Sequence, residues 1–250
     1  MLVLLPPSET KSDGGAGGPL DLDALSFPEL TPLRRKLADA LVTLAADVPA
    51  SLRALELSQR QHHEVHRNAA LLTSPTAPAL SRYTGVLYDA LDAKTLTKAE
   101  KSRADGRLAV ASALFGVVRA GDPIPAYRLS GGSALPGVGP LGTLWRPELE
   151  PVLKAADDLV IDMRSGAYAT LAKVPEAVVV KVIMPNGKTV SHHNKAYKGR
   201  LARVLATARR EPTTVAGLVR TATAAGLTMR QTGERTVDLV VMDQSRATVV

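Results

Sequence analysis

The chain has 250 residues, of which 45% are apolar and 22% charged, a balance typical of a globular protein with a substantial buried core. Aromatic residues make up only 3%, which argues against a surface of stacking aromatics for single-stranded nucleic acid. Because cysteine is absent, disulfides, iron–sulfur ligation, zinc ribbons and cysteine nucleophiles are excluded. No apolar run reaches the roughly 18 residues that a membrane span needs, so we expect no membrane association and a cytoplasmic location.

The net charge of +7 is distributed unevenly. Residues 1–150 carry 16 basic and 16 acidic residues, which cancel, whereas residues 151–250 carry 15 basic and 8 acidic residues, 15 − 8 = +7. General solubility would not require such segregation. The excess in the C-terminal region therefore favours a polyanionic partner.

The pattern of apolar residues predicts strands and helices that alternate irregularly along the chain. We expect strands at 1–5, 108–118, 124–129, 159–163, 177–184, 188–191, 227–232 and 236–242. We expect helices at 28–46, in two pieces within 52–72, and at 85–91, 98–103, 142–156, 166–171, 194–210 and 214–225. Neither a repeat nor a linker divides the chain, so residues 1–250 are expected to form one compact α/β mixed (α+β) domain. It would have a mixed sheet, surrounding helices and a C-terminal two-helix basic segment.

The predicted helix at 194–210 is the most informative segment. At about 100° per residue, the apolar residues fall on one arc and most of the basic residues on the opposite arc. The opposite arc holds Lys195, Lys198, Arg203, Arg209 and Arg210, with Arg200 near the border. Residues 188–210 contain seven basic and no acidic residues, so this face lacks the i,i+4 ion pairs of an ordinary surface helix. It suits DNA phosphates, although two core helices with a basic exterior remain an alternative interpretation.

Polar residues follow several of the predicted strands and could line a second kind of site. Ser8 and Lys11 come soon after the first strand, Arg128 lies near the end of the strand at 124–129, and Ser165 follows the strand at 159–163. Polar side chains at the carboxyl ends of strands often line sites in α/β folds. A hydroxyl, an ammonium and a guanidinium would suit one phosphate or carboxylate, although the loops could equally well satisfy their own backbones.

Two further motifs carry weaker signals. The segment Leu135-Pro-Gly-Val-Gly139 matches the hairpin sequence of helix-hairpin-helix proteins, in which backbone N–H groups approach a phosphate. Alternatively, the segment forms a plain turn. His62, His63 and His66 share one predicted helix without an evident third ligand. We therefore expect no metal site, and nothing in the sequence suggests a cofactor.

Several short motifs occur in the order and spacing of one known family. They are Met1-Leu-Val-Leu-Leu-Pro-Pro-Ser-Glu-Thr-Lys11, Gly85-Val-Leu-Tyr88, Leu114-Phe-Gly-Val-Val-Arg119, Pro125-Ala-Tyr-Arg-Leu129, Trp145, Ser165 with Tyr168, and Lys195 to Arg200. Together they resemble the YaaA peroxide-stress family over nearly the whole chain. The chain departs from the family pattern at Glu9, where many members have a lysine, at Ala90, which replaces a glycine, and at Ala120, which replaces a proline.

The resemblance implies a single-domain mixed fold with a positively charged cleft, a role in limiting peroxide damage, and double-stranded or distorted DNA as the partner. It implies that Lys195, Lys198 and Arg200 match the basic C-terminal segment of the family. It also places Tyr127 and Arg128 in a Pro-Tyr-Arg-Leu motif and Tyr168 beside Ser165.

Two functions follow as the main hypotheses, beside a third in which the protein is a structural, stress-related adaptor. The first is a DNA-binding protein that has no enzymatic activity and contacts phosphates with little sequence preference. The second is an enzyme that acts on a nucleotide or nucleobase in a positively charged pocket built from Ser8, Lys11, Tyr127, Arg128, Ser165 and Tyr168. No set of residues in the sequence has the pattern of a catalytic site that would indicate a reaction. The sequence also leaves the oligomeric state open.

Overall fold

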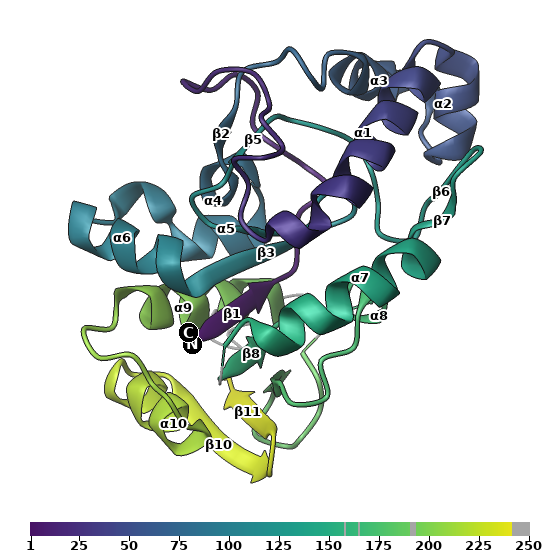
Figure 1. The fold of residues 1–250 in the computed structure, drawn as a ribbon. Coiled ribbons are helices and arrows are strands. Elements are labelled where there is room, and N and C mark those ends of the chain that lie inside the picture. The colour runs from purple at the N-terminus through teal and green to yellow at the C-terminus, as the bar shows by residue number, and fades with distance from the viewer. Residues whose placement is uncertain (158, 165, 191–193, 242–250) are drawn as a thin grey trace, which may run out of the picture.

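The computed structural model describes residues 1–241 with the exception of 158, 165 and 191–193. A seven-stranded mixed sheet crosses the centre of the molecule (Figure 1). Its strands, in spatial order, are β10 (Thr228–Gly233), β11 (Thr236–Val240), β9 (Val178–Ile183), β8 (Val160–Asp162), β1 (Leu2–Leu5), β3 (Leu108–Ser112) and β4 (Gly116–Arg119). The five inner strands are parallel, and the edge strands β10 and β4 are antiparallel to their neighbours. The predicted fold class is therefore confirmed.

Strand β1 lies in the middle of this sheet because its sequence permits burial on both faces. All of its residues are fully buried, as expected for a continuous apolar run in a parallel sheet. Val3 and Leu4 pair with β3 on one side and with β8 on the other.

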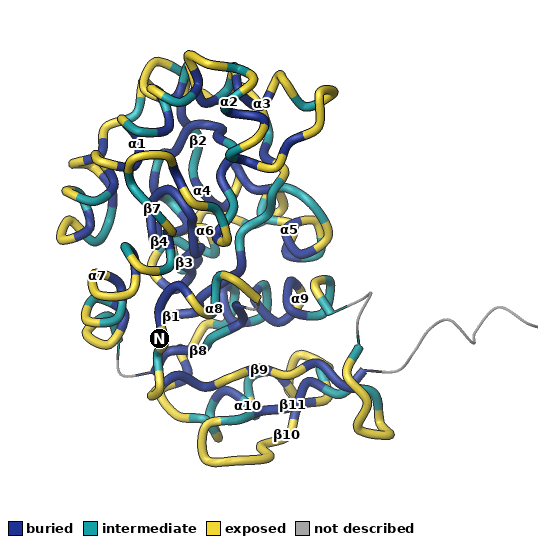
Figure 2. The backbone as a smooth tube through the Cα atoms, turned by 90° about the vertical axis from the view of Figure 1, so that its right-hand side faces the viewer, coloured by how far each residue is buried: buried dark blue, intermediate teal, exposed yellow. Residues whose placement is uncertain are grey.

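Helices cover both faces of the sheet, and further helices cap one end (Figures 1 and 2). The face opposite α7 (Leu141–Ala155) carries α5 (Val86–Leu91), α6 (Lys98–Arg107), α9 (Asn194–Thr207) and α10 (Val215–Ala224). The cap consists of α1 (Thr31–Ala45), α2 (Val48–Ala54) and α3 (His62–Ala69). The shorter helices are α4 (Ala79–Arg82) and α8 (Ala167–Leu171). Within the described residues, no helix is both long and apolar enough to cross a bilayer.

The apolar run at 108–118 was predicted as one strand, and this prediction is wrong. The run folds back on itself, so that β3 and β4 form an antiparallel hairpin around residues 113–115. Gly116 has φ +73°, and a Cβ there would lie 2.7 Å from the ring of Trp145. The turn is thus held under α7, where the Trp145 indole N–H donates to the carbonyl oxygen of Ala113 at 2.8 Å. Glycine inside an apolar run was the signal for this reversal.

Two other strand predictions need correction, whereas the glycine loop takes the plain-turn alternative. Only Pro123–Ile124 of the strand expected at 124–129 is a strand, β5, which pairs with β2 (Ala77–Pro78). The turn at Asn186-Gly187 leads to a single bridge between Ile183 and Thr189 rather than to a hairpin strand; Ser191 lies outside the described residues. The glycine loop forms a small hairpin of β6 (Ala134–Leu135) and β7 (Gly139–Pro140) directly before α7. Residues 125–133 before it are not helical.

Candidate functional site

The order of the strands creates a switch point between β1 and β8. The chain proceeds from β1 to β3 on one side, and from β8 to β9 on the other. The loops that leave the carboxyl ends of β1 and β8 therefore diverge. In open α/β sheets, ligands bind in the crevice outside the carboxyl ends of the strands at such a point. The loop at residues 6–11 and the loop that begins at Met163 leave the sheet here.

Lys11 is the central cation at this edge of the sheet. Its side chain is buried, with 7% of the residue exposed, and its Nζ lies 4.2 Å from the ring centroid of Tyr127 and 5.3 Å from that of Tyr83. The ammonium donates to the carbonyl oxygens of Ser8 at 3.2 Å and of Glu9 at 3.4 Å. Burial lowers the pKa of Lys11 from 10.5 to about 8, while the two rings favour the charged form through cation–π attraction.

A chain of buried hydroxyl groups forms the wall behind Lys11. The Tyr127 hydroxyl lies 2.8 Å from that of Tyr83 and 2.7 Å from Oγ of Ser112, the last residue of β3. The ring of Tyr88 stacks on Tyr83, and its hydroxyl donates to the Pro6 carbonyl at 2.8 Å. Burial raises the pKa of Tyr83 to about 12, and it holds the pKa values of Tyr88 and Tyr127 well above their usual range. The wall is therefore neutral at physiological pH.

The Glu9 carboxylate lies between Arg128 and Tyr168. Arg128 Nη1 is 3.3 Å from Glu9 Oε2, and the Tyr168 hydroxyl is 3.5 Å from Glu9 Oε1. Asn68 on α3 holds the backbone of Arg128 with two hydrogen bonds of 2.7 and 2.8 Å. The backbone N–H of Gly131 donates to the Tyr168 hydroxyl at 3.1 Å. Burial, with the negative charge of Glu9 as a second cause, raises the pKa of Tyr168.

The structure thus brings together four of the six residues expected to form a pocket: Lys11, Tyr127, Arg128 and Tyr168. Ser8 contributes its carbonyl oxygen to Lys11, while its Oγ accepts a hydrogen bond from the Thr10 N–H within the same loop. Ser165 lies outside the described residues.

Four residues of the site were not predicted from the sequence: Glu9, Tyr83, Ser112 and Asn68. Tyrosine was the available signal, because four of the five tyrosines in the chain gather around this one loop. As for metals, the described residues contain no group of three or more His, Asp or Glu side chains able to hold an ion.

The basic helix α9 differs from its prediction at Lys198, which we expected on the outer arc. Lys198 is only 6% exposed, and its Nζ donates to the Met163 carbonyl at 2.9 Å. Burial is the main cause that lowers its pKa, which the charge of Asp162 opposes. The prediction failed because α9 is covered on two sides, by α5 and by the sheet, so its buried arc is wider than that of a one-sided amphipathic helix.

Arg203 is also engaged within the protein rather than free for a ligand. Its guanidinium donates to the carbonyl oxygens of Leu91 and Asp92, both at 2.7 Å, and to Thr95 Oγ1 at 2.7 Å. It thereby satisfies the carboxyl end of α5, where carbonyl groups lack helical partners. Arg203 is thus a structural contact between α5 and α9.

The remaining four cations of the basic segment are exposed, but they lie at different places along it. Lys195 is in the first turn of α9, and Arg200, which stacks 5.2 Å from the ring of Tyr197, is in its middle. Arg209 and Arg210 follow the helix, which ends at Thr207. They do not belong to its outer arc as predicted.

Fold and site together define an α/β protein with a lysine–tyrosine cluster at the switch point of its sheet and a basic C-terminal segment. The chain matches the model of the family "Peroxide stress protein YaaA" over residues 1–232. It belongs to this family, as the motifs had indicated.

Relatives match along most of their length. A UPF0246 protein of Corynebacterium efficiens is 51% identical over 96% of this chain and 100% of the relative. A UPF0246 protein of Streptomyces coelicolor is 47% identical over 82% of each chain. An uncharacterised protein of Campylobacter jejuni is 28% identical over 82% of this chain and 85% of the relative.

Proposed function

We propose that this peroxide stress protein binds double-stranded or distorted DNA through the four exposed cations of its basic segment, Lys195, Arg200, Arg209 and Arg210. The observation that supports this proposal is that carboxylates of the described residues do not neutralise the charges of these four cations. Residues 177–210 contain eight basic and no acidic residues. Within the described part of the chain, none of the four cations forms an ion pair with a carboxylate.

Uncompensated exposed cations favour a phosphate backbone because each neutralised phosphate releases condensed counterions. Along α9, from Lys195 to Thr207, the segment spans about 18 Å at a rise of roughly 1.5 Å per residue, and Arg209 and Arg210 follow directly after the helix. A duplex of that length carries about a dozen phosphates, of which those on one side can meet the four cations. Contacts of this type fix the position of a protein on the duplex without reading its sequence. We therefore expect little sequence preference.

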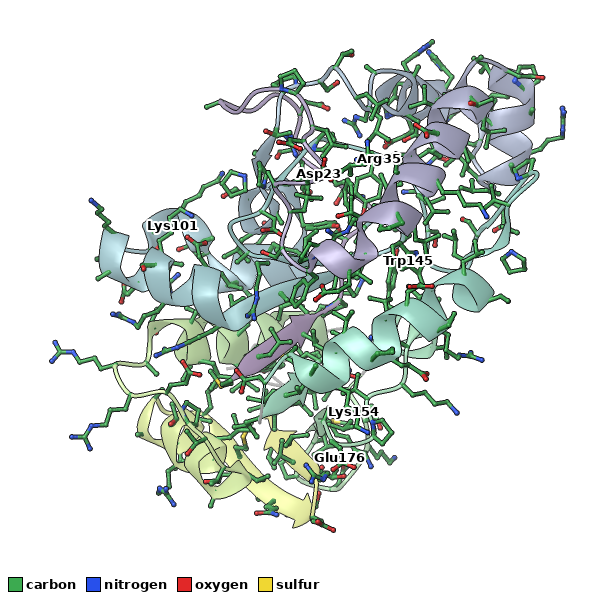
Figure 3. All side chains as sticks on the ribbon, viewed as in Figure 1. Asp23, Arg35, Lys101, Trp145, Lys154 and Glu176 are labelled. Atoms are coloured by element: carbon green, nitrogen blue, oxygen red, sulfur yellow. The ribbon has the colours of Figure 1, made fainter. Side chains whose placement is uncertain are left out.

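The test removes the cations in two pairs and measures affinity for a labelled duplex by fluorescence anisotropy. We expect both Lys195→Ala/Arg200→Ala and Arg209→Ala/Arg210→Ala to weaken binding by about tenfold or more at physiological salt. Lys36→Ala/Lys154→Ala is the matched control. It removes the same charge from exposed positions on α1 and α7, the latter labelled in Figure 3, and should leave affinity nearly unchanged. Equal losses in all three variants, or no loss in the first two, would contradict the proposal.

A further inference from the structure

Glu9 is a carboxylate poorly satisfied by the donors that surround it. Its distances to Arg128 and Tyr168 are 3.3 and 3.5 Å, whereas charge-assisted hydrogen bonds are typically about 2.7–2.9 Å. Oε2 is sheltered from solvent, yet it accepts no hydrogen bond from the described residues. The side chain as a whole is 42% exposed. The Glu9 carboxylate is therefore held mainly by electrostatic attraction, and its side chain is free to turn out into solvent.

The donors, by contrast, are fixed in place. Two hydrogen bonds from Asn68 hold the backbone of Arg128, whose side chain is only 18% exposed. Gly131 holds the Tyr168 hydroxyl, and Lys11 is anchored by two carbonyl groups beside Glu9. These donors come from the loop after β1, the segment after β5 and helix α8. We call Lys11, Arg128 and Tyr168 the cradle; because its members are pre-positioned, an incoming anion would cost little ordering of side chains.

We propose that the cradle of Lys11, Arg128 and Tyr168 is a binding site for a phosphate group, and that the Glu9 carboxylate occupies this site until a phosphate displaces it. A phosphate monoester carries about 1.5 to 2 negative charges and three acceptor oxygens, against one charge and two oxygens for Glu9. The guanidinium fork and the ammonium are the usual partners of phosphate. The position of the cradle at the switch point of the sheet is where ligands of α/β folds bind.

The phosphate could be the terminal group of a nucleotide or a phosphodiester within DNA. The burial of Lys11 and the partial burial of Arg128 favour a terminal group, because its three free oxygens can reach such donors more easily than those of a phosphodiester within a duplex. This inference does not depend on the proposed binding of DNA to the basic segment, which uses other residues.

Isothermal titration calorimetry with inorganic phosphate and with AMP tests the site. Glu9→Gln keeps the shape of the side chain and removes its charge, so we expect both ligands to bind at least about tenfold more tightly than to the wild type, since one charge–charge competitor is lost. Arg128→Met should abolish binding. Arg128→Lys, which keeps the charge but loses the fork, should weaken it. Arg146→Met is the control, because Arg146 is exposed on α7 and outside the cradle.

Thermal unfolding without ligand establishes that each variant is folded. If Arg128→Met does not fold, Arg128→Lys and Tyr168→Phe carry the test. The proposal is overturned if Glu9→Gln binds none of phosphate, AMP and duplex DNA more tightly than the wild type does, or if the folded Arg128 variants bind as well as Arg146→Met. A parallel titration with duplex DNA separates the two sources. If Glu9→Gln binds AMP more tightly than the wild type does, the cradle binds a terminal phosphate. If it binds only duplex DNA more tightly, the cradle binds a phosphodiester and the preference for a terminal group is overturned.

Discussion

At the scale of single residues, the buried ammonium of Lys11 has the most measurable consequence. Burial lowers its pKa from 10.5 to about 8, so between these values the unfolded chain binds a proton that the folded protein has released. The free energy of unfolding should then rise with pH across this window, by up to about 1.4 kcal/mol per pH unit. Below pH 8 the folded protein bears the full cost of the buried charge.

Lys11→Met isolates this effect because it keeps the length of the side chain and removes the titrating group. Urea unfolding of both proteins between pH 8 and 10 should show the wild type gaining about 2 kcal/mol relative to the variant. The upper limit of pH 10 matters because burial raises the pKa of Tyr83 to about 12, so tyrosine titration in the unfolded chain acts in the opposite direction at higher pH. Parallel curves for the two proteins would show that Lys11 has an ordinary pKa in the folded state.

The sequence identified Lys11 and Arg128, and the family resemblance added Tyr127 and Tyr168, but neither identified Tyr83 or the contacts that organise the site. Lys11 and Arg128 could be selected because Lys11 follows the first predicted strand and Arg128 lies near the end of the strand expected at 124–129, of which only Pro123–Ile124 forms. The position of Glu9 between Arg128 and Tyr168 depends instead on which strands become neighbours, and β1 pairs with strands more than 100 residues away in the chain. Such pairing is set by burial of the whole sheet, which local spacing does not reveal.

At the scale of elements, the packing of α9 on α5 explains both the successes and the failure of the helix prediction. Helical periodicity correctly placed Leu201 and Leu205 inside. It could not show that Gly199 allows the backbones of the two helices to approach. A Cβ at Gly199 would lie 2.1 Å from the carbonyl oxygen of Leu87. This close contact widens the buried arc and takes Lys198 inside with it.

Gly199→Ala tests this contact, because the direction in which it changes the free energy of unfolding depends on whether the two helices approach closely. Alanine ordinarily stabilises a helix relative to glycine by up to about 1 kcal/mol, but here the added methyl group collides with a backbone carbonyl that cannot move independently. We expect a loss of about 1–3 kcal/mol in the free energy of unfolding, as for other overpacked sites. Gly106→Ala on α6 is the control, since its Cβ would meet nothing within 4 Å. It should be neutral or stabilising, and a similar gain at Gly199 would disprove the close approach.

At the scale of the whole molecule, only part of the excess positive charge in the C-terminal region is exposed and uncompensated. Of the six cations expected to meet DNA, Lys198 and Arg203 serve the fold by tying α9 to the loop after β8 and to the end of α5. The other four remain exposed. The net +7 of the C-terminal hundred residues thus contains both structural and uncompensated charges, and only the uncompensated ones can contribute to binding a polyanion.

The dependence of duplex DNA affinity on salt concentration tests the central claim most directly. Four phosphate contacts predict that the logarithm of the association constant falls linearly with the logarithm of salt concentration, with a slope of about −3 to −4. In the variant with alanine at 195, 200, 209 and 210, the slope should approach zero. A flat dependence in the wild type, or an undiminished slope in that variant, would contradict the assignment of DNA binding to the basic segment.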